Sequence, residues 1–306
     1  MARLTRRRFV KQAAVAGSGL ATVLNSTAAG RFEPDLGFQL YTLREILATR
    51  AGEAFGALAK AGYKKVEVLR EGLEQLAPMM KAAGLTPVSG HFDSFLVTGN
   101  WEAWTRDPGY TAPPKGYDWA AAIAQATNLG LKYMVLPYLT PRERGGLDSY
   151  RRLADRMNKA GEESNKSGIR FCYHHHSFEF APVEGRRPFD ILVERCDKRF
   201  VSFEVDVFWV SVAGHDPVEI LQVLSGRVPL LHVKDKAKGT AQSFSEEAVP
   251  PGAFKEVGSG VLDVPAILRA AASAGVQEYF VEQDQCPGDP VDSLTQSYRY
   301  LRQLSL

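Results

Sequence analysis

Val201-Ser-Phe-Glu-Val-Asp206 and Pro229-Leu-Leu-His-Val-Lys234 are two short apolar runs that each end in a charged residue. Apolar runs of this length are typical of buried strands. The chain contains eight runs of this kind, at residues 37–41, 65–69, 86–91, 132–136, 169–174, 201–206, 229–234 and 279–282. Stretches with a helical period separate them, most clearly at 51–61, 73–83 and 120–129, and these are followed by a glycine within one residue. This alternation predicts an α/β protein with a parallel sheet.

Eight strand-helix units over residues 37–306 fit the size of a single-domain (β/α)8 barrel, the TIM barrel. An open doubly wound sheet is the alternative, but the first strand-helix turn lacks the Gly-x-Gly-x-x-Gly motif of such folds. Gly258-Ser259-Gly260 matches only the first part of this motif, and we expect it to lie in a loop. Two long loops, 92–116 and 235–260, follow strands, and we therefore expect both on the face where barrels place their active sites.

Composition and charge exclude several classes of protein. Apolar residues make up 45% and charged residues 24% of the 306 residues, which is ordinary for a globular chain. Three cysteines are too few for a disulfide scaffold. Residues 1–29 carry five basic residues and no acid, so the net charge of +2 leaves −3 for the remainder. A mildly acidic body argues against a nucleic-acid partner.

The N-terminal segment resembles a twin-arginine export signal. Thr5-Arg6-Arg7-Arg8-Phe9-Val10-Lys11 matches the Ser/Thr-Arg-Arg-x-Phe-Leu-Lys pattern, and a weakly apolar stretch and the small residues Thr27-Ala28-Ala29 follow it. We expect a signal peptide over residues 1–29, passage through the twin-arginine translocase and a periplasmic location. A basic amphipathic helix on a membrane surface is the alternative, but the stretch lacks a polar face. No later segment has the apolar length of a membrane helix, so we expect no stable membrane anchor.

Polar residues gather at the ends of the last four predicted strands. Because side chains alternate along a strand, residues two apart share a side, and the inward ones meet at one end of a barrel. The pairs are His174 with His176, Glu204 with Asp206, His232 with Lys234, and Glu282 with Asp284. Singly, Asp206 could cap a helix, His232 could be a core histidine and Glu282 could pair with Lys234. Jointly, histidine and carboxylate donors suit Mn²⁺, Zn²⁺, Fe²⁺ or Co²⁺.

Several motifs resemble those of the xylose isomerase-like sugar phosphate isomerase/epimerase family. They are Gln39-Leu-Tyr-Thr-Leu-Arg44, Tyr173-His-His-His-Ser-Phe-Glu-Phe180, Glu204-Val-Asp-Val-Phe-Trp209, Leu231-His-Val-Lys-Asp235 and Val281-Glu-Gln-Asp284. The resemblance extends from Gly37 to the C-terminus. It implies a TIM barrel that holds one divalent metal ion (Mn, Zn, Co, Fe or Mg) with ligands from strands five to eight.

The resemblance also implies roles for individual residues. Asp206, His232 and Glu282 match the metal ligands of strands six, seven and eight. The strand-five ligand is open between His176 and His174, with Glu179 as a further alternative, because family epimerases usually have glutamate there. The residues expected to face the sugar are Glu67, His91, Lys234 and Trp209, the last as a stacking platform.

The implied activity is that of a metal-dependent carbohydrate isomerase or epimerase. Glu282, or a free His174, His175 or His176, would remove a proton next to a carbonyl group that the metal ion chelates. The missing second glutamate weakens a two-base epimerisation, so a lyase that cleaves 3-keto-glycosides by β-elimination is the alternative. Two other hypotheses are a non-catalytic periplasmic sugar-binding protein and an endonuclease-IV-like phosphodiesterase. For all of these hypotheses except the phosphodiesterase, the expected partner is a small sugar or glycoside.

Overall fold

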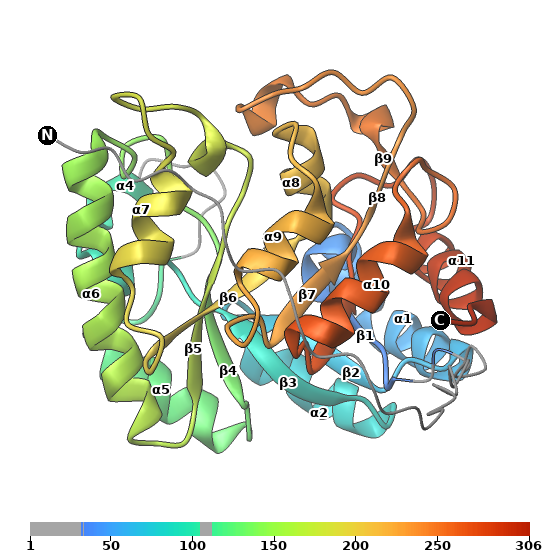
Figure 1. Cartoon of the computed structure of the whole chain (residues 1–306). Helices are drawn as coiled ribbons and strands as arrows, with labels where there is room; N and C mark the ends of the chain where they lie inside the picture. The colour runs from blue at the N-terminus through green and yellow to red at the C-terminus, as the bar shows by residue number, and fades with distance from the viewer. Residues whose placement is uncertain (1–31, 33, 105–111) are drawn as a thin grey trace, which may run out of the picture.

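The computed structural model describes residue 32 and residues 34–104 and 112–306. Its centre is a closed barrel of parallel strands in the order β1-β10-β7-β6-β5-β4-β3-β2 (Figure 1). The strands are β1 (Gly37–Gln39), β2 (Lys65–Leu69), β3 (Thr86–His91), β4 (Tyr133–Leu136), β5 (Arg170–His174), β6 (Val201–Asp206), β7 (Leu230–Val233) and β10 (Glu278–Val281). The predicted (β/α)8 barrel is confirmed, and the open sheet is excluded because β1 pairs with β10. The predicted signal, residues 1–29, lies outside the described residues.

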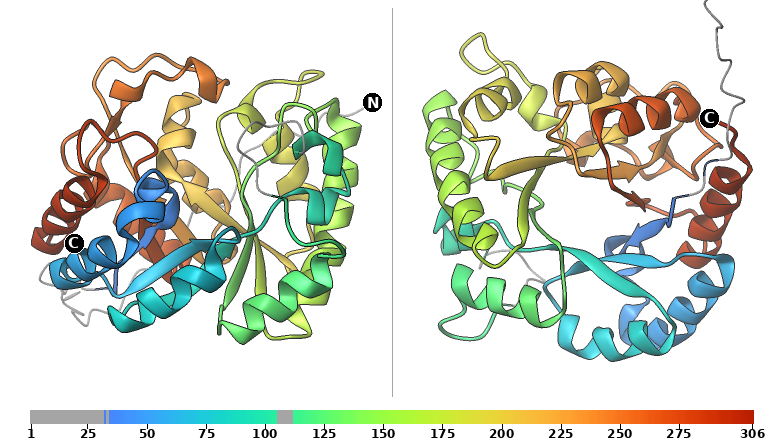
Figure 2. Two further views of the ribbon diagram at one scale, coloured as in Figure 1. Left: turned by 180° about the vertical axis from the view of Figure 1, so that it is seen from behind. Right: turned by 60° about the horizontal axis from the view of Figure 1, so that its bottom comes forward.

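Helices follow every barrel strand and form an outer ring (Figure 2). The longer ones are α1 (Leu47–Ala61), α2 (Leu73–Ala82), α5 (Trp119–Asn128), α6 (Leu147–Asn165), α7 (Pro188–Arg195), α9 (Pro217–Val223), α10 (Val264–Ala274) and α11 (Pro290–Gln303). Short helices are α3 (Phe95–Thr98), α4 (Trp101–Trp104) and α8 (Val207–Val212). The helices predicted at 51–61, 73–83 and 120–129 correspond to α1, α2 and α5. Local sequence sets the ends: Asp118 accepts a hydrogen bond from Ala121 N at the start of α5.

The loop after β7 contains a small antiparallel pair that the sequence did not indicate, β8 (Asp235–Lys236) with β9 (Phe254–Lys255). The Asp235 carboxylate accepts backbone N–H groups of Gly258 and Gly260, each at 2.9 Å, and of Leu262 at 3.1 Å. A Cβ atom on Gly260 would lie 2.2 Å from Asp235 Oδ1, so this close approach requires glycine. Gly258-Ser259-Gly260 therefore lies in a loop, as expected, and Asp235 holds it.

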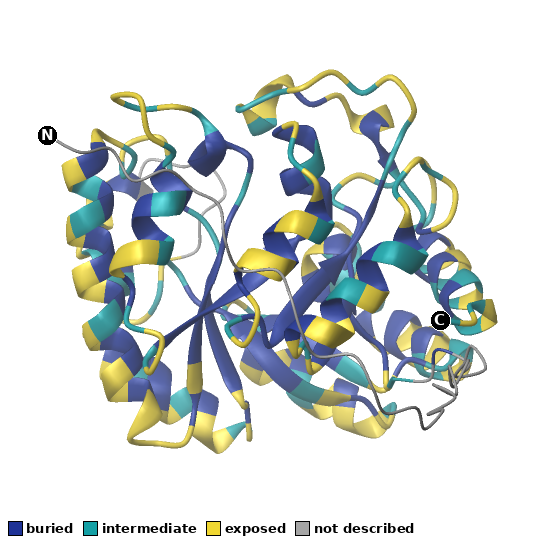
Figure 3. Ribbon diagram, viewed as in Figure 1, coloured by how far each residue is buried: buried dark blue, intermediate teal, exposed yellow. Residues whose placement is uncertain are grey.

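The barrel interior below the strand ends is apolar. Val88, Tyr133, Val135, Cys172, Leu230 and Phe280 form a buried cluster there. A larger core lies between the strands and the helices, so the barrel strands are buried on both faces while the helices expose their outer sides (Figure 3). This apolar layer separates the polar carboxyl ends of the strands from the Lys65–Glu278 ion pair at the starts of β2 and β10.

One close contact between α6 and the start of β6 gives a stability prediction. A Cβ atom on Gly161 would lie 2.3 Å from the carbonyl oxygen of Phe200. Because backbone cannot move aside cheaply, we expect Gly161→Ala to lower the free energy of unfolding by about 1–3 kcal/mol. The measurement is urea denaturation. The control is Gly56→Ala in α1, where a Cβ atom meets nothing within 4 Å and helix propensity favours alanine. Equal stability of wild type and Gly161→Ala would contradict the prediction.

Candidate active site and metal centre

A cavity of about 510 Å³ opens at the carboxyl ends of the barrel strands. Its lining comes from most strands and from the loops that follow them: Tyr41, Leu69, Arg70, Glu71, His91, Phe92, Asp93, Pro137, Tyr138, His174, His176, Trp209, Lys234, Glu246, Glu282 and Asp284. Aromatic rings and charged groups alternate in this lining, which suits the apolar faces and hydroxyl edges of a sugar.

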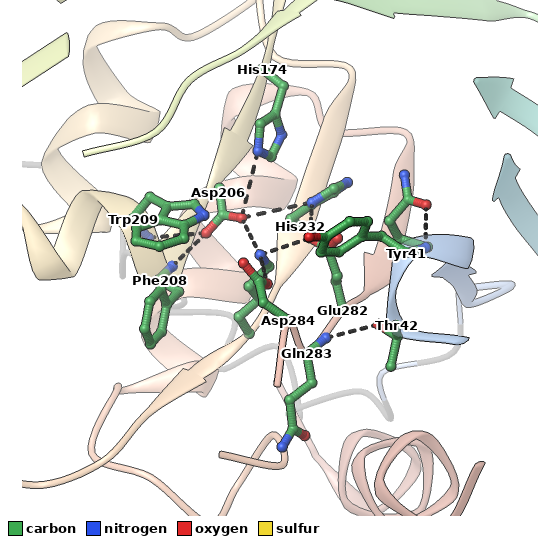
Figure 4. A network of polar contacts seen from close by, with 12 residues as sticks. Tyr41, Thr42, His174, Asp206, Phe208, Trp209, His232, Glu282, Gln283 and Asp284 are labelled. Carbon is green, nitrogen blue, oxygen red and sulfur yellow. Dashed lines mark hydrogen bonds and ion pairs between the residues drawn. The ribbon is translucent and has the colours of Figure 1, made fainter. Parts of the chain in front are cut away.

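Asp206 lies at the centre of the polar network (Figure 4). Its Oδ1 atom caps α8 by accepting the N–H groups of Phe208 at 2.9 Å and Trp209 at 3.0 Å. The helix cap considered from sequence is therefore real. It uses only one oxygen, however, and Oδ2 points the other way, to 2.9 Å from Lys234 Nζ. The same lysine nitrogen lies 2.7 Å from Glu282 Oε2 and also contacts Asp284.

The charged side chains of this group shift the pKa values of one another. Burial opposes the charge of Lys234, but Asp206, Asp284 and Glu282 outweigh burial and raise the pKa of its ammonium group. Burial also opposes ionisation of Glu282, yet Lys234 and His232 lower the pKa of that carboxyl group. At Asp284 burial outweighs Lys234 and raises the pKa. These shifts favour the charged form of Lys234 and the ionised form of Glu282.

A layer of histidines and carboxylates lies directly beneath. Glu67 Oε2 is 2.5 Å from His232 Nε2 and 3.1 Å from His91 Nε2. Glu204 Oε2 is 3.1 Å from His91 Nε2, 3.1 Å from His174 Nδ1 and 3.4 Å from His232 Nε2. Burial opposes a proton on His91, but Glu67 and Glu204 raise its pKa to about 9. In this lower layer, His91 Nε2, His174 Nδ1 and His232 Nε2 each face a carboxylate.

Two groups of side chains offer donors close enough to share a metal ion. The upper group is Asp206, His232 and Glu282, and the lower group is His91, His174, Glu204 and His232. Among the described residues, neither buried Asp206 Oδ2 nor buried His232 Nδ1 makes a hydrogen bond of regular geometry, although Lys234 Nζ lies 2.9 Å from the oxygen and Glu282 Oε2 lies 2.8 Å from the nitrogen. Buried polar atoms are normally satisfied. The upper group therefore fits a divalent cation. In the lower group, hydrogen bonds already occupy Glu204 Oε2 and the nitrogens of His91 and His174 that face it, and among the described residues Glu204 Oε1 is left without a partner.

The structure separates the three candidates for the strand-five ligand. His174 Nε2 lies 3.8 Å from Asp206 Oδ2, next to the upper group. His176 belongs to neither group; its ring lies against Trp209 and its Nδ1 atom has no partner among the described residues. Glu179 is fully buried and accepts Tyr173 Oη at 2.5 Å and His176 N at 2.9 Å, away from the cavity. The geometry favours His174 over the other two.

The residues expected to face the sugar divide in a similar way. His91, Lys234 and Trp209 line the cavity. Glu67 does not: it is fully buried below and holds His232, so the structure gives it a contact with a histidine in place of the expected contact with a sugar. The resemblance implied a contact of Glu67 with a sugar but contains no information on how deeply this side chain lies.

Two residues without a predicted role belong to the site. Asp284 lines the cavity, and Glu204 contacts three histidines from below. Their signal was in the sequence, since each lies two residues from a predicted ligand on the same side of its strand.

Comparison with known proteins agrees with the barrel fold. The model of the family described as xylose isomerase-like TIM barrel matches residues 55–304. The chain belongs to this family. A curated relative, inosose dehydratase from Geobacillus thermodenitrificans, is 24% identical over 266 residues, which cover 82% of this chain and 88% of the relative.

Solved structures are similar as well. A sugar phosphate isomerase/epimerase from Parabacteroides distasonis superposes with a TM-score of 0.68 and 25% identity over 93% of this chain and 98% of its own. The IOLI protein, solved with a bound zinc atom, has a TM-score of 0.62 and 16% identity over 87% and 95% of the two chains. This xylose isomerase-like barrel thus has relatives named as dehydratases, isomerases and epimerases, and its own histidine and carboxylate cluster is able to bind a metal ion. Within the described residues, no helix has the length and hydropathy of a membrane span.

Proposed function

We propose that this protein is a metal-dependent lyase that removes a proton next to the carbonyl group of a keto sugar and expels the β-substituent. The observation that carries the proposal is the upper group, in which the buried donors Asp206 Oδ2 and His232 Nδ1 lie close to Glu282, a residue that lines a sugar-sized cavity. A divalent ion bound there polarises a carbonyl oxygen and acidifies the neighbouring C–H bond.

The side chains supply the remaining chemistry. Glu282 Oε2 takes the proton, since this carboxylate lines the cavity. The Lys234 ammonium group faces the same space and stabilises negative charge that develops on the carbonyl oxygen. Trp209 supports one face of the sugar. The C–H bond breaks, a C=C bond forms and the C–O bond to the leaving group breaks. The leaving oxygen gains the proton that Glu282 took up, which returns Glu282 to its ionised form.

Two observations favour elimination over epimerisation. The strand-five position carries His174, so the pair of metal-bound glutamates on opposite faces of a substrate is missing, and elimination needs only one such base. Four curated relatives that match this chain over 88% of their length are named inosose dehydratase, and loss of water from a keto-cyclitol is a β-elimination.

Isomerisation or epimerisation is the second candidate, and His176 favours it. This side chain lines the cavity and its Nδ1 atom has no hydrogen-bond partner among the described residues. A neutral imidazole in that position could exchange a proton with the face of the substrate opposite Glu282. The structural neighbour from Parabacteroides distasonis carries the isomerase/epimerase name.

The test is metal analysis of the purified protein followed by NMR in D₂O with three substrate classes: 3-keto-glycosides, keto-cyclitols, and aldose or ketose sugars. Elimination predicts release of the aglycone or of water with an unsaturated ketone as the product. Epimerisation predicts deuterium at the carbon next to the carbonyl group without a leaving group. Saturable sugar binding with neither product would identify a non-catalytic sugar-binding protein and overturn the proposal.

We also propose that the protein is exported through the twin-arginine pathway. The translocation machinery reads the arginine pair, so we expect Arg6→Lys combined with Arg7→Lys to leave a folded protein inside the cell. Cell fractionation measures this. Arg8→Lys, at the variable position of the pattern, is the matched control and should be exported normally. Normal periplasmic accumulation of the double variant would contradict the assignment of residues 1–29 as a twin-arginine signal.

A further inference from the structure

One carboxylate, Glu204, contacts both histidines nearest the metal-binding atoms. Its Oε2 atom lies 3.1 Å from His174 Nδ1 and 3.4 Å from His232 Nε2. The opposite ring nitrogens, His174 Nε2 and His232 Nδ1, face Asp206 Oδ2 at 3.8 Å and 3.7 Å. Each imidazole therefore has one nitrogen toward Glu204 and the other toward the upper group, and Glu204 connects the two rings.

Glu204 is fully buried and receives these contacts from below the cavity. Its neighbour Glu67 restricts His232 further, with Oε2 at 2.5 Å from His232 Nε2. Glu67 is itself held by Gln39 Nε2 at 3.0 Å and by Ser89 Oγ at 2.6 Å. Because an ionised carboxylate only accepts hydrogen bonds, the ring nitrogens that face these two residues carry the protons.

A neutral imidazole has a single N–H group, and the hydrogen bond made by one nitrogen decides which nitrogen is left to bind a metal ion. Carboxylates that accept the N–H of a ligating histidine orient the ring and raise its basicity. We propose that Glu204 is a positioning residue that presents His174 Nε2 to the metal ion and, together with Glu67, presents His232 Nδ1. The inference rests on the metal centre of the proposed function and adds to it the layer that selects the ligating nitrogens.

The test is the affinity of the full chain for Mn²⁺, measured by titration calorimetry on Glu204→Gln. The new amide group can donate to His174 Nδ1 or His232 Nε2, which moves the ring proton to the nitrogen that must ligate. We expect the Kd for Mn²⁺ to rise by about 10- to 100-fold. The matched control is Glu278→Gln, which removes a buried carboxylate at the start of β10, where its partner is Lys65 at 2.5 Å. This control should keep the Kd of wild type.

A second measurement uses wild type and does not depend on the folding of a variant. In the Zn²⁺-loaded protein, ¹⁵N NMR of the histidine rings should show His174 protonated at Nδ1 and His232 protonated at Nε2. Either proton on the opposite nitrogen overturns the inference, as does a folded Glu204→Gln protein with the Kd of wild type. In both of these cases wild type still binds the metal ion and the proposed function stands. Failure of wild type to bind Mn²⁺ or Zn²⁺ would instead overturn the proposed function together with the inference.

Discussion

Glu282→Gln should lower turnover by about 10²- to 10⁴-fold, the range that general-base catalysis contributes. Glutamine keeps an oxygen for the metal ion and for Lys234 Nζ, which lies 2.7 Å from Glu282 Oε2. It cannot accept the proton of the C–H bond. The protein should therefore fold and retain measurable metal while deuterium exchange at the substrate carbon almost stops.

Metal content and exchange rate must be measured on the same preparation. Asp284→Asn serves as a comparison, because Asp284 contacts the same lysine from the cavity side but is not a member of the upper group. If metal-loaded Glu282→Gln exchanges within a few-fold of wild type, Glu282 is a ligand only. The base would then be His176, which lines the cavity and does not belong to the upper group.

Asp206→Asn should remove most of the bound metal ion. Asparagine retains a side-chain oxygen for the N–H groups of Phe208 and Trp209, so the start of α8 should persist. The carboxylate that faces His232 Nδ1 and Lys234 is lost, and with it one of the few anionic donors of the upper group. We expect metal content after dialysis to fall from about one ion per chain toward zero, with little change in circular dichroism.

His232→Ala should have the same effect on metal content through a different ligand, which makes the pair of variants a consistency check. Plasma mass spectrometry measures the metal content. Unchanged stoichiometry in folded Asp206→Asn would place the ion elsewhere, and the lower group around His91 and Glu204 would be the site to test next.

The sequence predicted the barrel well because its signals are local. Apolar runs between helical stretches located all eight barrel strands, and parity correctly placed His174, Asp206, His232 and Glu282 on the inward side at one end. A strand that is buried on both faces has a strong apolar signal whatever its neighbours are. Side-chain alternation follows from backbone geometry alone, so the strand ends that meet could be named in advance.

The organisation within the site was beyond sequence reasoning because it depends on contacts between strands. The direction of the His174 ring depends on Glu204 from β6, and the depth of Glu67 depends on Gln39, Ser89 and His232 from three other strands. Residue spacing along one strand contains no such information. The choice between His174 and His176 therefore required coordinates, although both residues share a side of the strand.

The anchoring of the loop after β7 by Asp235 has a consequence for ligand binding. The Asp235 carboxylate accepts hydrogen bonds from four backbone amides, those of Lys236, Gly258, Gly260 and Leu262. Glu246 from the same loop lines the cavity. The loss of chain entropy in this segment takes place when the protein folds, before any ligand arrives. A sugar that contacts Glu246 meets a wall that is already ordered, so its binding free energy is not reduced by the cost of ordering that loop.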